Sequence, residues 1–382
     1  KNRTRTVQPM KRKGDLDLRF NWNAPMAISA FVPDRFYMGS QFLHKSEDMG
    51  DSWDIISPDL TTNDSTKQDQ SSSGGLSVDN SGAENHTTIF TIAESPLDEN
   101  ILWVGTDDGN VKVTKDGGEN WSNVTENLVG IPANTWVYHI EASVHGKGTA
   151  YAVFEGHTSG DMNPYTLKTI DYGQTWSNII SEDVHGFIRN IQEDYESENL
   201  LFLGTEFGLY VTIDGGENWS KFENNMPATA VHFMELQKQT NDLVMGTHGR
   251  GVIIIDDISP LRELSQEVLA QDVYFFKNKP FTMLEDSGFS GSFGTETQFV
   301  GQSKSSAARI VYYLKKRHTF GKMKMEVFDM EGNKITNLSP EKSKGINVIT
   351  WGFNKNVPKM AQGKTYHLEV LPLQELLLAT IK

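Results

Sequence analysis

The sequence predicts an all-β protein in which a β-propeller of five blades is followed by a short helix and an immunoglobulin- or fibronectin-like β-sandwich. An eight-residue unit with the pattern [ST]-x-D-x-G-x-x-W occurs four times, beginning at Ser46, Thr114, Thr169 and Thr212. The shortest step between two copies, from 169 to 212, is 43 residues, the length of one four-stranded propeller blade. Between the copies lie short apolar runs rich in β-branched and aromatic residues, which are typical of strands.

Each position of the repeated unit has a structural use. The Asp carboxylate can accept hydrogen bonds from its own turn, the Gly allows a positive φ, and the hydroxyl residue closes the turn. The Trp ring enters the next strand and can pack between neighbouring blades. We therefore predict a structural role for four pairs: Asp48 and Trp53, Asp116 and Trp121, Asp171 and Trp176, and Asp214 and Trp219.

The amino-acid composition argues against several classes of function. The chain has 382 residues and 37% hydrophobic content, enough for two or three domains. A net charge of −15 argues against binding to nucleic acid or to an anionic membrane surface. Without cysteine there is neither a disulfide nor a thiolate zinc site, and no apolar run is long enough for a membrane span. The first residues contain neither Met nor an apolar signal core, so we expect the chain to begin within a longer protein.

The propeller is expected after a linker at 1–20. The blades are predicted at 21–60, 85–128, 134–180, 184–225 and 228–258, and apolar triplets ending in Gly-Thr mark three of the second strands. The fifth blade lacks the repeated unit. Since a propeller must close its edges, we expect an upstream part of the same polypeptide to complete the ring or to form another one. Residues 61–82, with a Ser-Ser-Ser-Gly-Gly run, are interpreted as a flexible loop, with a lid over substrate as the alternative.

The remainder is predicted as a helical linker at 259–272 and a sandwich at 273–382. Ser259 can cap the helix, Pro260 suits its first position, and apolar residues follow at 261, 264, 268 and 269. Strands of the sandwich are expected at 308–314, 323–328, 346–351 and 366–370, after a Gly/Ser-rich segment at 287–306.

The repeated unit resembles the Asp-box, or bacterial neuraminidase repeat, of sialidases, xyloglucanases and sortilin-type propellers. Four further segments, 18–25, 56–61, 246–251 and 312–314, resemble bacterial sortilin-like "glycosyl hydrolase" repeat proteins, so that the resemblance covers nearly the whole chain. It implies the C-terminal portion of an exported bacterial protein, with Asp-boxes on the outer rim away from any ligand. It implies no activity, because members of that family are mostly named after their repeats.

Ligand-binding residues are expected on the face opposite the Asp-box turns, where the turns between second and third strands emerge. The turns carry Gln41, Asp107, Asp108, Glu206, His248 and Arg250, and the segments leading into the inner strands add Asn21, Trp22, Asn23, His86, Trp136, Tyr138, His185, Arg189 and His232. From these we predict a ligand-binding set of His248, Arg250, Trp22, Trp136, Tyr138, His185 and Arg189. The alternative is that each His or Trp packs between blades.

The sequence favours a non-catalytic binding or scaffolding module that recognises a protein, peptide or glycan in a bacterial cell-surface or periplasmic assembly. No metal or cofactor is expected, because the acidic turns lack the full calcium-loop pattern. The alternative is a glycoside hydrolase, which needs two carboxylates; Asp107, Asp108 and Glu206 are the candidates in this chain, and others would lie in upstream blades. Sialidase chemistry is disfavoured, since it needs three arginines and a Tyr nucleophile. Residues 21–258 hold only Arg35, Arg189 and Arg250, and Arg35 is expected in a turn on the opposite face.

Overall fold

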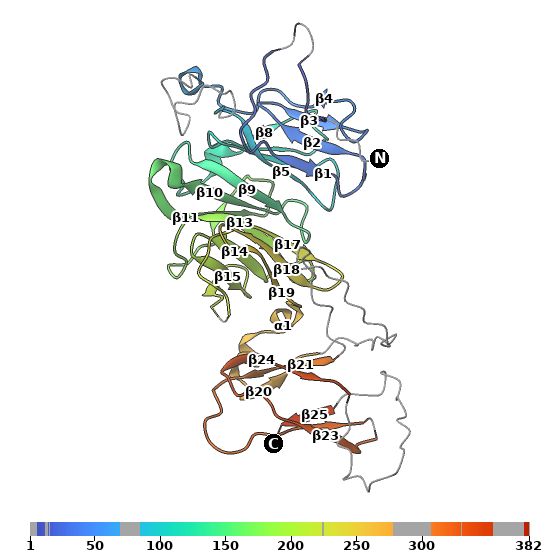
Figure 1. Ribbon diagram of the computed structural model, residues 1–382. Helices are drawn as coiled ribbons and strands as arrows, with labels where there is room; N and C mark the ends of the chain where they lie inside the picture. Colours follow the sequence, from blue (N-terminus) through green and yellow to red (C-terminus); the bar gives the residue numbers. More distant parts are fainter. Residues whose placement is uncertain are drawn as a thin grey trace, which may run out of the picture. The chain divides into compact units, whose positions relative to one another are not determined.

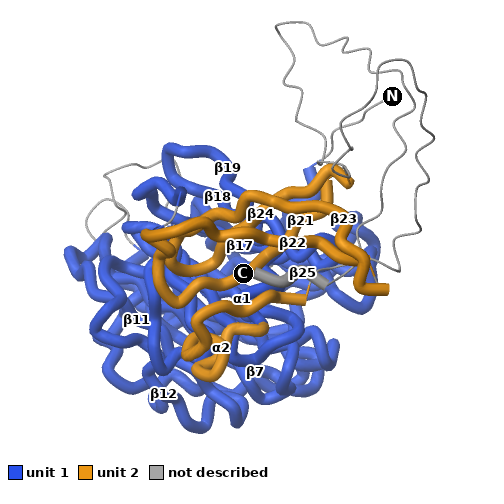
Figure 2. Tube along the Cα trace, turned by 90° about the horizontal axis from the view of Figure 1, so that it is seen from below, with its two compact units in different colours: residues 1–262 blue, residues 263–382 orange. Residues whose placement is uncertain are grey.

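The computed structural model describes residues 6–11, 14, 16–68, 85–223, 225–277, 307–329, 331–353 and 378–381. This part of the chain is all-β, with antiparallel sheets and two short α-helices, as predicted (Figure 1). The chain consists of two compact units, unit 1 (residues 1–262) and unit 2 (residues 263–382) (Figure 2). The predicted Gly/Ser-rich segment at 287–306, the predicted strand at 366–370 and residues 69–82 of the predicted loop lie outside the described residues.

Unit 1 contains five consecutive antiparallel sheets, each formed by strands in sequence order (Figure 1). The first has β1 (Met26–Ile28), β2 (Phe36–Gly39), β3 (Leu43–Ser46) and β4 (Asp54–Ile55). The second has β5 (Ile89–Glu94), β6 (Leu102–Thr106), β7 (Val111–Thr114) and β8 (Ser122–Asn123). The third has β9 (Trp136–Ala142), β10 (Ala150–Gly156), β11 (Asp161–Thr169) and β12 (Ser177–Asn178). The fourth has β13 (Ile188–Glu193), β14 (Leu201–Thr205), β15 (Gly208–Thr212) and β16 (Ser220–Lys221), and the fifth has β17 (Val231–Gln237), β18 (Asp242–Thr247) and β19 (Gly251–Ile255).

Successive sheets pack face to face through apolar clusters, and glycines in the second strands allow the backbones to approach closely. A Cβ placed on Gly39 would lie 2.7 Å from Cβ of Ile89, and one on Gly204 would lie 2.7 Å from the carbonyl oxygen of Val231. A Cβ placed on Gly246 would have Cβ of Phe233, in the same sheet, as its nearest neighbour at 3.8 Å. The face of β17–β19 that carries Gly246 is therefore open among the described residues.

The four repeated turns share one hydrogen-bond pattern. In the second sheet, one oxygen of Asp116 accepts from Oγ1 of Thr114 at 2.7 Å and from the backbone N–H of Asn120 at 2.9 Å. The other oxygen accepts from the Asn120 amide at 2.7 Å. Led by this Asn120 side-chain bond, these interactions lower the pKa of Asp116 to about 2. Corresponding bonds occur at Asp48, Asp171 and Asp214.

The Trp side chains of these turns reach toward the preceding segment. Trp121 donates through Nε1 to the carbonyl of Ile56 at 3.2 Å, and Trp219 donates to the carbonyl of Ile179 at 2.6 Å. Both carbonyls follow the last strand of the preceding sheet, so each ring joins two sheets. Trp53 donates to Val7 at 2.8 Å, and Trp176 packs edge-on against Trp103.

The predicted helix after the fifth sheet is divided into two: α1 (Ser259–Arg262) ends unit 1 and α2 (Gln266–Ala270) lies in unit 2. The expectation of one continuous helix was wrong because Ser265 has extended backbone and starts a new helix, its side chain accepting from the N–H of Val268.

Unit 2 holds two three-stranded antiparallel sheets. One has the order β20 (Val273–Phe275), β21 (Ala308–Leu314) and β24 (Gly345–Trp351), and the other β23 (Lys334–Leu338), β22 (Met325–Phe328) and β25 (Leu378–Ile381). One apolar cluster takes Tyr312 and Trp351 from the first sheet and Met325 and Val327 from the second. In the described part of the chain, no helix is long and apolar enough to cross a membrane.

Candidate functional site

Four inner strands of unit 1 share an irregularity near their first residue. The pairing register shifts at Phe90 in β5, Tyr138 in β9, Arg189 in β13 and His232 in β17. Such a β-bulge inserts one unpaired residue and redirects its side chain. Each bulge lies where the inner strand pairs with the end of the second strand, so the four side chains lie beside the turns between second and third strands.

Three of the bulged residues, Phe90, Tyr138 and Arg189, belong to a continuous row of planar side chains, which we call the planar row. Ring centroids are 6.0 Å apart between His86 and Trp136, 5.2 Å between Trp136 and Phe90, and 5.1 Å between Phe90 and Tyr138. The Arg189 guanidinium carbon lies 5.0 Å from the Tyr138 ring and 5.2 Å from the Phe187 ring. His157 stacks on Phe187 at 4.8 Å, which completes the row.

Arg189 is a half-buried cation without a carboxylate partner. Its Nη1 donates to the Tyr138 hydroxyl at 3.0 Å, and its buried Nε has no hydrogen-bond partner within the described residues. No described carboxylate forms an ion pair with it, whereas Arg19, Arg35 and Arg262 pair at 2.9, 2.6 and 2.7 Å. Because desolvating a charge is costly without a counter-charge, this guanidinium is suited to bind an anion.

Two histidines, His157 and His232, lie close enough to Arg189 for its charge to lower their pKa values in addition to burial. His232 and His248 have ring centroids 5.2 Å apart, and burial, aided by the charge of Arg189, lowers the pKa of His232 to about 4. Burial also lowers the pKa of His157, whose Nδ1 is hydrogen-bonded to the buried Glu155 carboxylate. His157 and His232 are therefore mostly neutral at neutral pH, and Arg189 supplies the fixed positive charge.

Two buried acceptor atoms near Arg189 have no hydrogen-bond partner within the described residues. They are Oε2 of Glu206, in the turn between β14 and β15, and Oδ1 of the adjacent Asn190. Asn190 lines a cavity of about 570 Å³ along the inner strands, together with Phe90, Tyr138, Arg189 and His232. This volume lies within the range of small-ligand pockets. Four glutamates, Glu94, Glu141, Glu193 and Glu235, line the same cavity. The site therefore combines a cation, unpaired acceptors, aromatic rings and carboxylates.

The candidate carboxylates Asp107 and Asp108 lie elsewhere on this face and bind neighbouring loops. Asp107 accepts from the N–H and hydroxyl of Thr88 at 2.8 and 2.6 Å and from Asn21 at 3.0 Å, and burial raises its pKa. Asp108 accepts from the N–H and hydroxyl of Thr62 at 2.8 and 2.6 Å. With these oxygens occupied, Glu206 is the candidate carboxylate with an unpaired oxygen.

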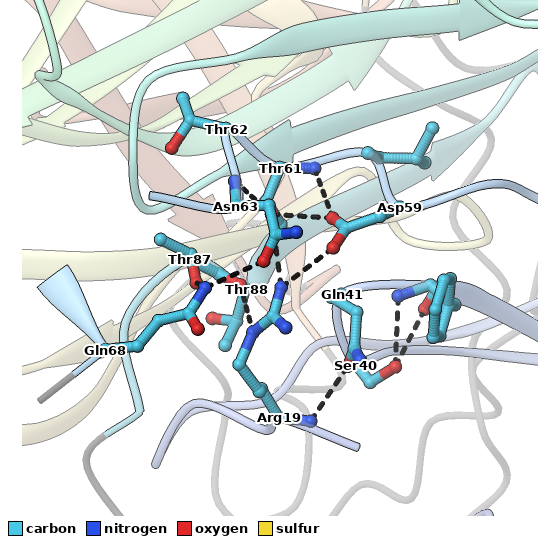
Figure 3. A network of polar contacts seen from close by, with 12 residues as sticks. Arg19, Ser40, Gln41, Asp59, Thr61, Thr62, Asn63, Gln68, Thr87 and Thr88 are labelled. Carbon is cyan, nitrogen blue, oxygen red and sulfur yellow. Dashed lines mark hydrogen bonds and ion pairs between the residues drawn. The ribbon is translucent and has the colours of Figure 1, made fainter. Parts of the chain in front are cut away.

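A neighbouring polar network connects the segments around these two aspartates (Figure 3). Arg19 pairs with Asp59 at 2.9 Å and donates to the carbonyl of Thr87 at 3.3 Å, and its backbone N–H donates to Gln41 at 2.8 Å. The network fixes the segment before the first sheet against the two loops that follow it. Its polar groups are satisfied by one another, which favours a structural role.

The predicted ligand-binding residues divide into two sets. Trp136, Tyr138 and Arg189 lie in the planar row, and His248 packs on His232, which lines the same cavity as Tyr138 and Arg189. Trp22 is 73% exposed, and His185 and Arg250 are also exposed and form no ring or cation–π contact with the described residues of the row.

Sequence reasoning missed Phe90, Phe187 and His157. The bulged residues do share a sequence signal, because each follows a β-branched residue: Ile89, Val137, Ile188 and Val231. Within the described residues, no group of three or more His, Asp or Glu side chains is arranged to hold a metal ion.

Comparison with known proteins finds no matching family model and no matching curated protein. Solved structures with partial likeness include the GH74 xyloglucanase from Xanthomonas campestris, at 17% identity and a TM-score of 0.46 over 61% of this chain and 36% of that one. YCF48 from Cyanidioschyzon merolae aligns at 19% identity and 0.34, over 45% and 53%. The extracellular domain of BT4673 from B. thetaiotaomicron aligns at 13% and 0.42, over 67% and 28%. The chain spans about a third of the GH74 structure's length, and such low scores establish neither a family nor a function.

Proposed function

We propose that residues 21–258 form five blades of a β-propeller that acts as a binding module, recognising a protein, peptide or glycan in a bacterial cell-surface or periplasmic assembly. The five consecutive sheets, packed face to face with their inner strands along one cavity, support this architecture. Residues 1–20 would be a linker, 259–272 a helical linker and 273–382 an immunoglobulin- or fibronectin-like sandwich. In this proposal the four Asp-box aspartates are structural and lie away from the ligand.

The observation that carries the binding function is the environment of Arg189. Its guanidinium is held between two aromatic rings, beside a cavity, without a carboxylate partner among the described residues. We would expect an arginine with a purely structural role to pair with a carboxylate, as Arg262 does with Asp194. A ligand on the planar row would supply the missing interaction.

Binding to glycan and peptide arrays tests this function. We expect Tyr138→Ala to weaken binding of any captured ligand by about tenfold, because it removes a ring and the hydroxyl that positions Arg189. Phe320→Ala is the matched control, an exposed aromatic in unit 2. Equal effects of the two substitutions, or no ligand on either array, would contradict the proposal.

A glycoside hydrolase remains the second candidate, and Glu206 is the observation in its favour. Its buried, unpaired oxygen and the buried Glu155 both adjoin His157, as a pair of acids flanking a substrate would. Release of reducing ends from a polysaccharide panel, abolished by Glu206→Gln, would establish hydrolysis. Binding without any release, by the same preparation, would exclude it for that panel.

A further inference from the structure

We infer that the ligand of the planar row is an acidic glycan, in which a carboxylate or sulfate on a sugar ring pairs with the guanidinium of Arg189. This inference rests on the proposed binding function and names its ligand class. It is carried by three features of the site: the uncompensated cation, the unpaired acceptors and the aromatic rings.

The charge comes first. The whole chain has a net charge of −15, and four glutamates, Glu94, Glu141, Glu193 and Glu235, line the same cavity, yet no described carboxylate forms an ion pair with Arg189 itself. Nη1 is directed to the Tyr138 hydroxyl and the two rings fix the guanidinium plane, so the cation is positioned before a ligand arrives. A charge-assisted hydrogen bond to such a preorganised donor selects an anionic group.

The acceptors select a ligand that also carries several donors. Oδ1 of Asn190, a residue that lines the cavity, is buried without a partner among the described residues and needs an O–H or N–H. Oε2 of Glu206, which lies outside the cavity lining, is buried and unpaired in the same way. A hexuronate or sulfated pyranose bears several hydroxyls on the same ring as its anion. An acidic peptide side chain carries its anion at the end of an apolar stem and offers mainly one amide donor per residue, so the glycan fits this donor requirement better.

The aromatic rings provide the apolar part of the contact. Phe90 and Tyr138 line the same cavity as Arg189 and Asn190, so the C–H face of a pyranose and its anion could contact the site together. One guanidinium is available in the row, so the inference concerns a single anion on a sugar within a chain.

Paired polysaccharides with the same backbone test the inference. Calorimetry would compare polygalacturonate with its fully methyl-esterified form, and a sulfated galactan with its desulfated form. We expect the anionic member of at least one pair to bind about tenfold or more tightly than its neutral match, with affinity falling as salt increases. Preference within the first pair identifies a carboxylate, and preference within the second identifies a sulfate.

Variants connect this preference with Arg189. Arg189→Gln should remove it, Arg189→Lys should retain part of it because charge remains without planar stacking, and Arg317→Gln, on the exposed surface of unit 2, should leave it unchanged. Circular dichroism melts verify that each variant is folded. If Arg189→Gln does not fold, affinities within the two polysaccharide pairs are compared for Arg189→Lys and His232→Gln instead.

Other outcomes separate this inference from the proposed function. Equal affinity within both polysaccharide pairs would overturn the acidic-glycan inference, as would binding only to acidic peptides; either result leaves a binding module intact. Failure of every glycan and peptide probe would remove the proposed function itself.

Discussion

The guanidinium of Arg189 lies 5.0 Å from the ring of Tyr138 and donates to its hydroxyl at 3.0 Å. The two residues lie 51 positions apart in sequence and occupy bulges at the same position of neighbouring inner strands. Tyr138 thus positions the cation that, in our account, binds the ligand.

Tyr138→Phe removes this hydrogen bond and keeps the ring. We expect ligand affinity to fall about two- to tenfold, since a typical hydrogen bond contributes about 0.5–1.5 kcal/mol. Thermal stability should change little, because the hydroxyl adjoins the cavity. Calorimetry on the array-identified ligand measures the effect, and an affinity equal to that of the wild type would show that Arg189 needs no positioning by Tyr138.

Two glycines at equivalent strand positions should differ in tolerance. Gly204→Val forces a side chain against the Val231 backbone, so we expect a loss of about 1–3 kcal/mol or more. Gly246→Val meets only open space and its own sheet, so the change should stay within about 0.5 kcal/mol. Urea denaturation of unit 1 compares the two variants, and similar midpoints would contradict the face-to-face packing described for the fourth and fifth sheets.

The four repeated turns should contribute to stability. Asp214→Ala leaves Thr212 and the backbone N–H of Asn218 without their acceptor, for an expected loss of about 1–3 kcal/mol. Asp183→Ala, at an exposed aspartate in a loop of the same unit, should change stability by less than about 0.5 kcal/mol. Unchanged melting of the Asp214 variant would argue against a structural role for the repeat.

His44 should make stability depend on pH. Burial lowers its pKa from 6.5 to about 4, so between these values the unfolded chain binds a proton that the folded chain does not. The folded state therefore loses stability as pH falls from 6.5 to 4, by up to about 3 kcal/mol. His44→Gln should flatten the stability profile in this window relative to wild type. Parallel profiles would mean that His44 is not buried in its neutral form.

Much of the all-β organisation could be predicted because the repeated unit fixes a turn and the Gly-Thr runs mark three of the five second strands. The break at Ser265 was missed, since one apolar pattern spans both helices and the cap depends on local backbone. The site was only partly predictable. Trp136, Tyr138 and Arg189 stand at the starts of inner strands, but Phe90 and Phe187 read as ordinary core residues.

What the sequence could not show is how polar groups are paired. Asp107 and Asp108 look like free acids until Thr88 and Thr62 are seen to occupy their oxygens. Arg189 and Arg262 look alike in sequence. Arg262 pairs with Asp194, which lies 68 positions before it, whereas no described carboxylate pairs with Arg189. Such pairings depend on which loops the sheets bring together.

The central claim is that Arg189 contacts the ligand, and NMR of side-chain ¹⁵Nε–H groups tests it most directly. With Arg189→Gln used to assign its signal, we predict that adding the anionic oligosaccharide selected by calorimetry shifts the Arg189 resonance and leaves those of Arg19, Arg35 and Arg262 in place, because these three are already ion-paired. An unmoved Arg189 resonance while the oligosaccharide binds would contradict the account.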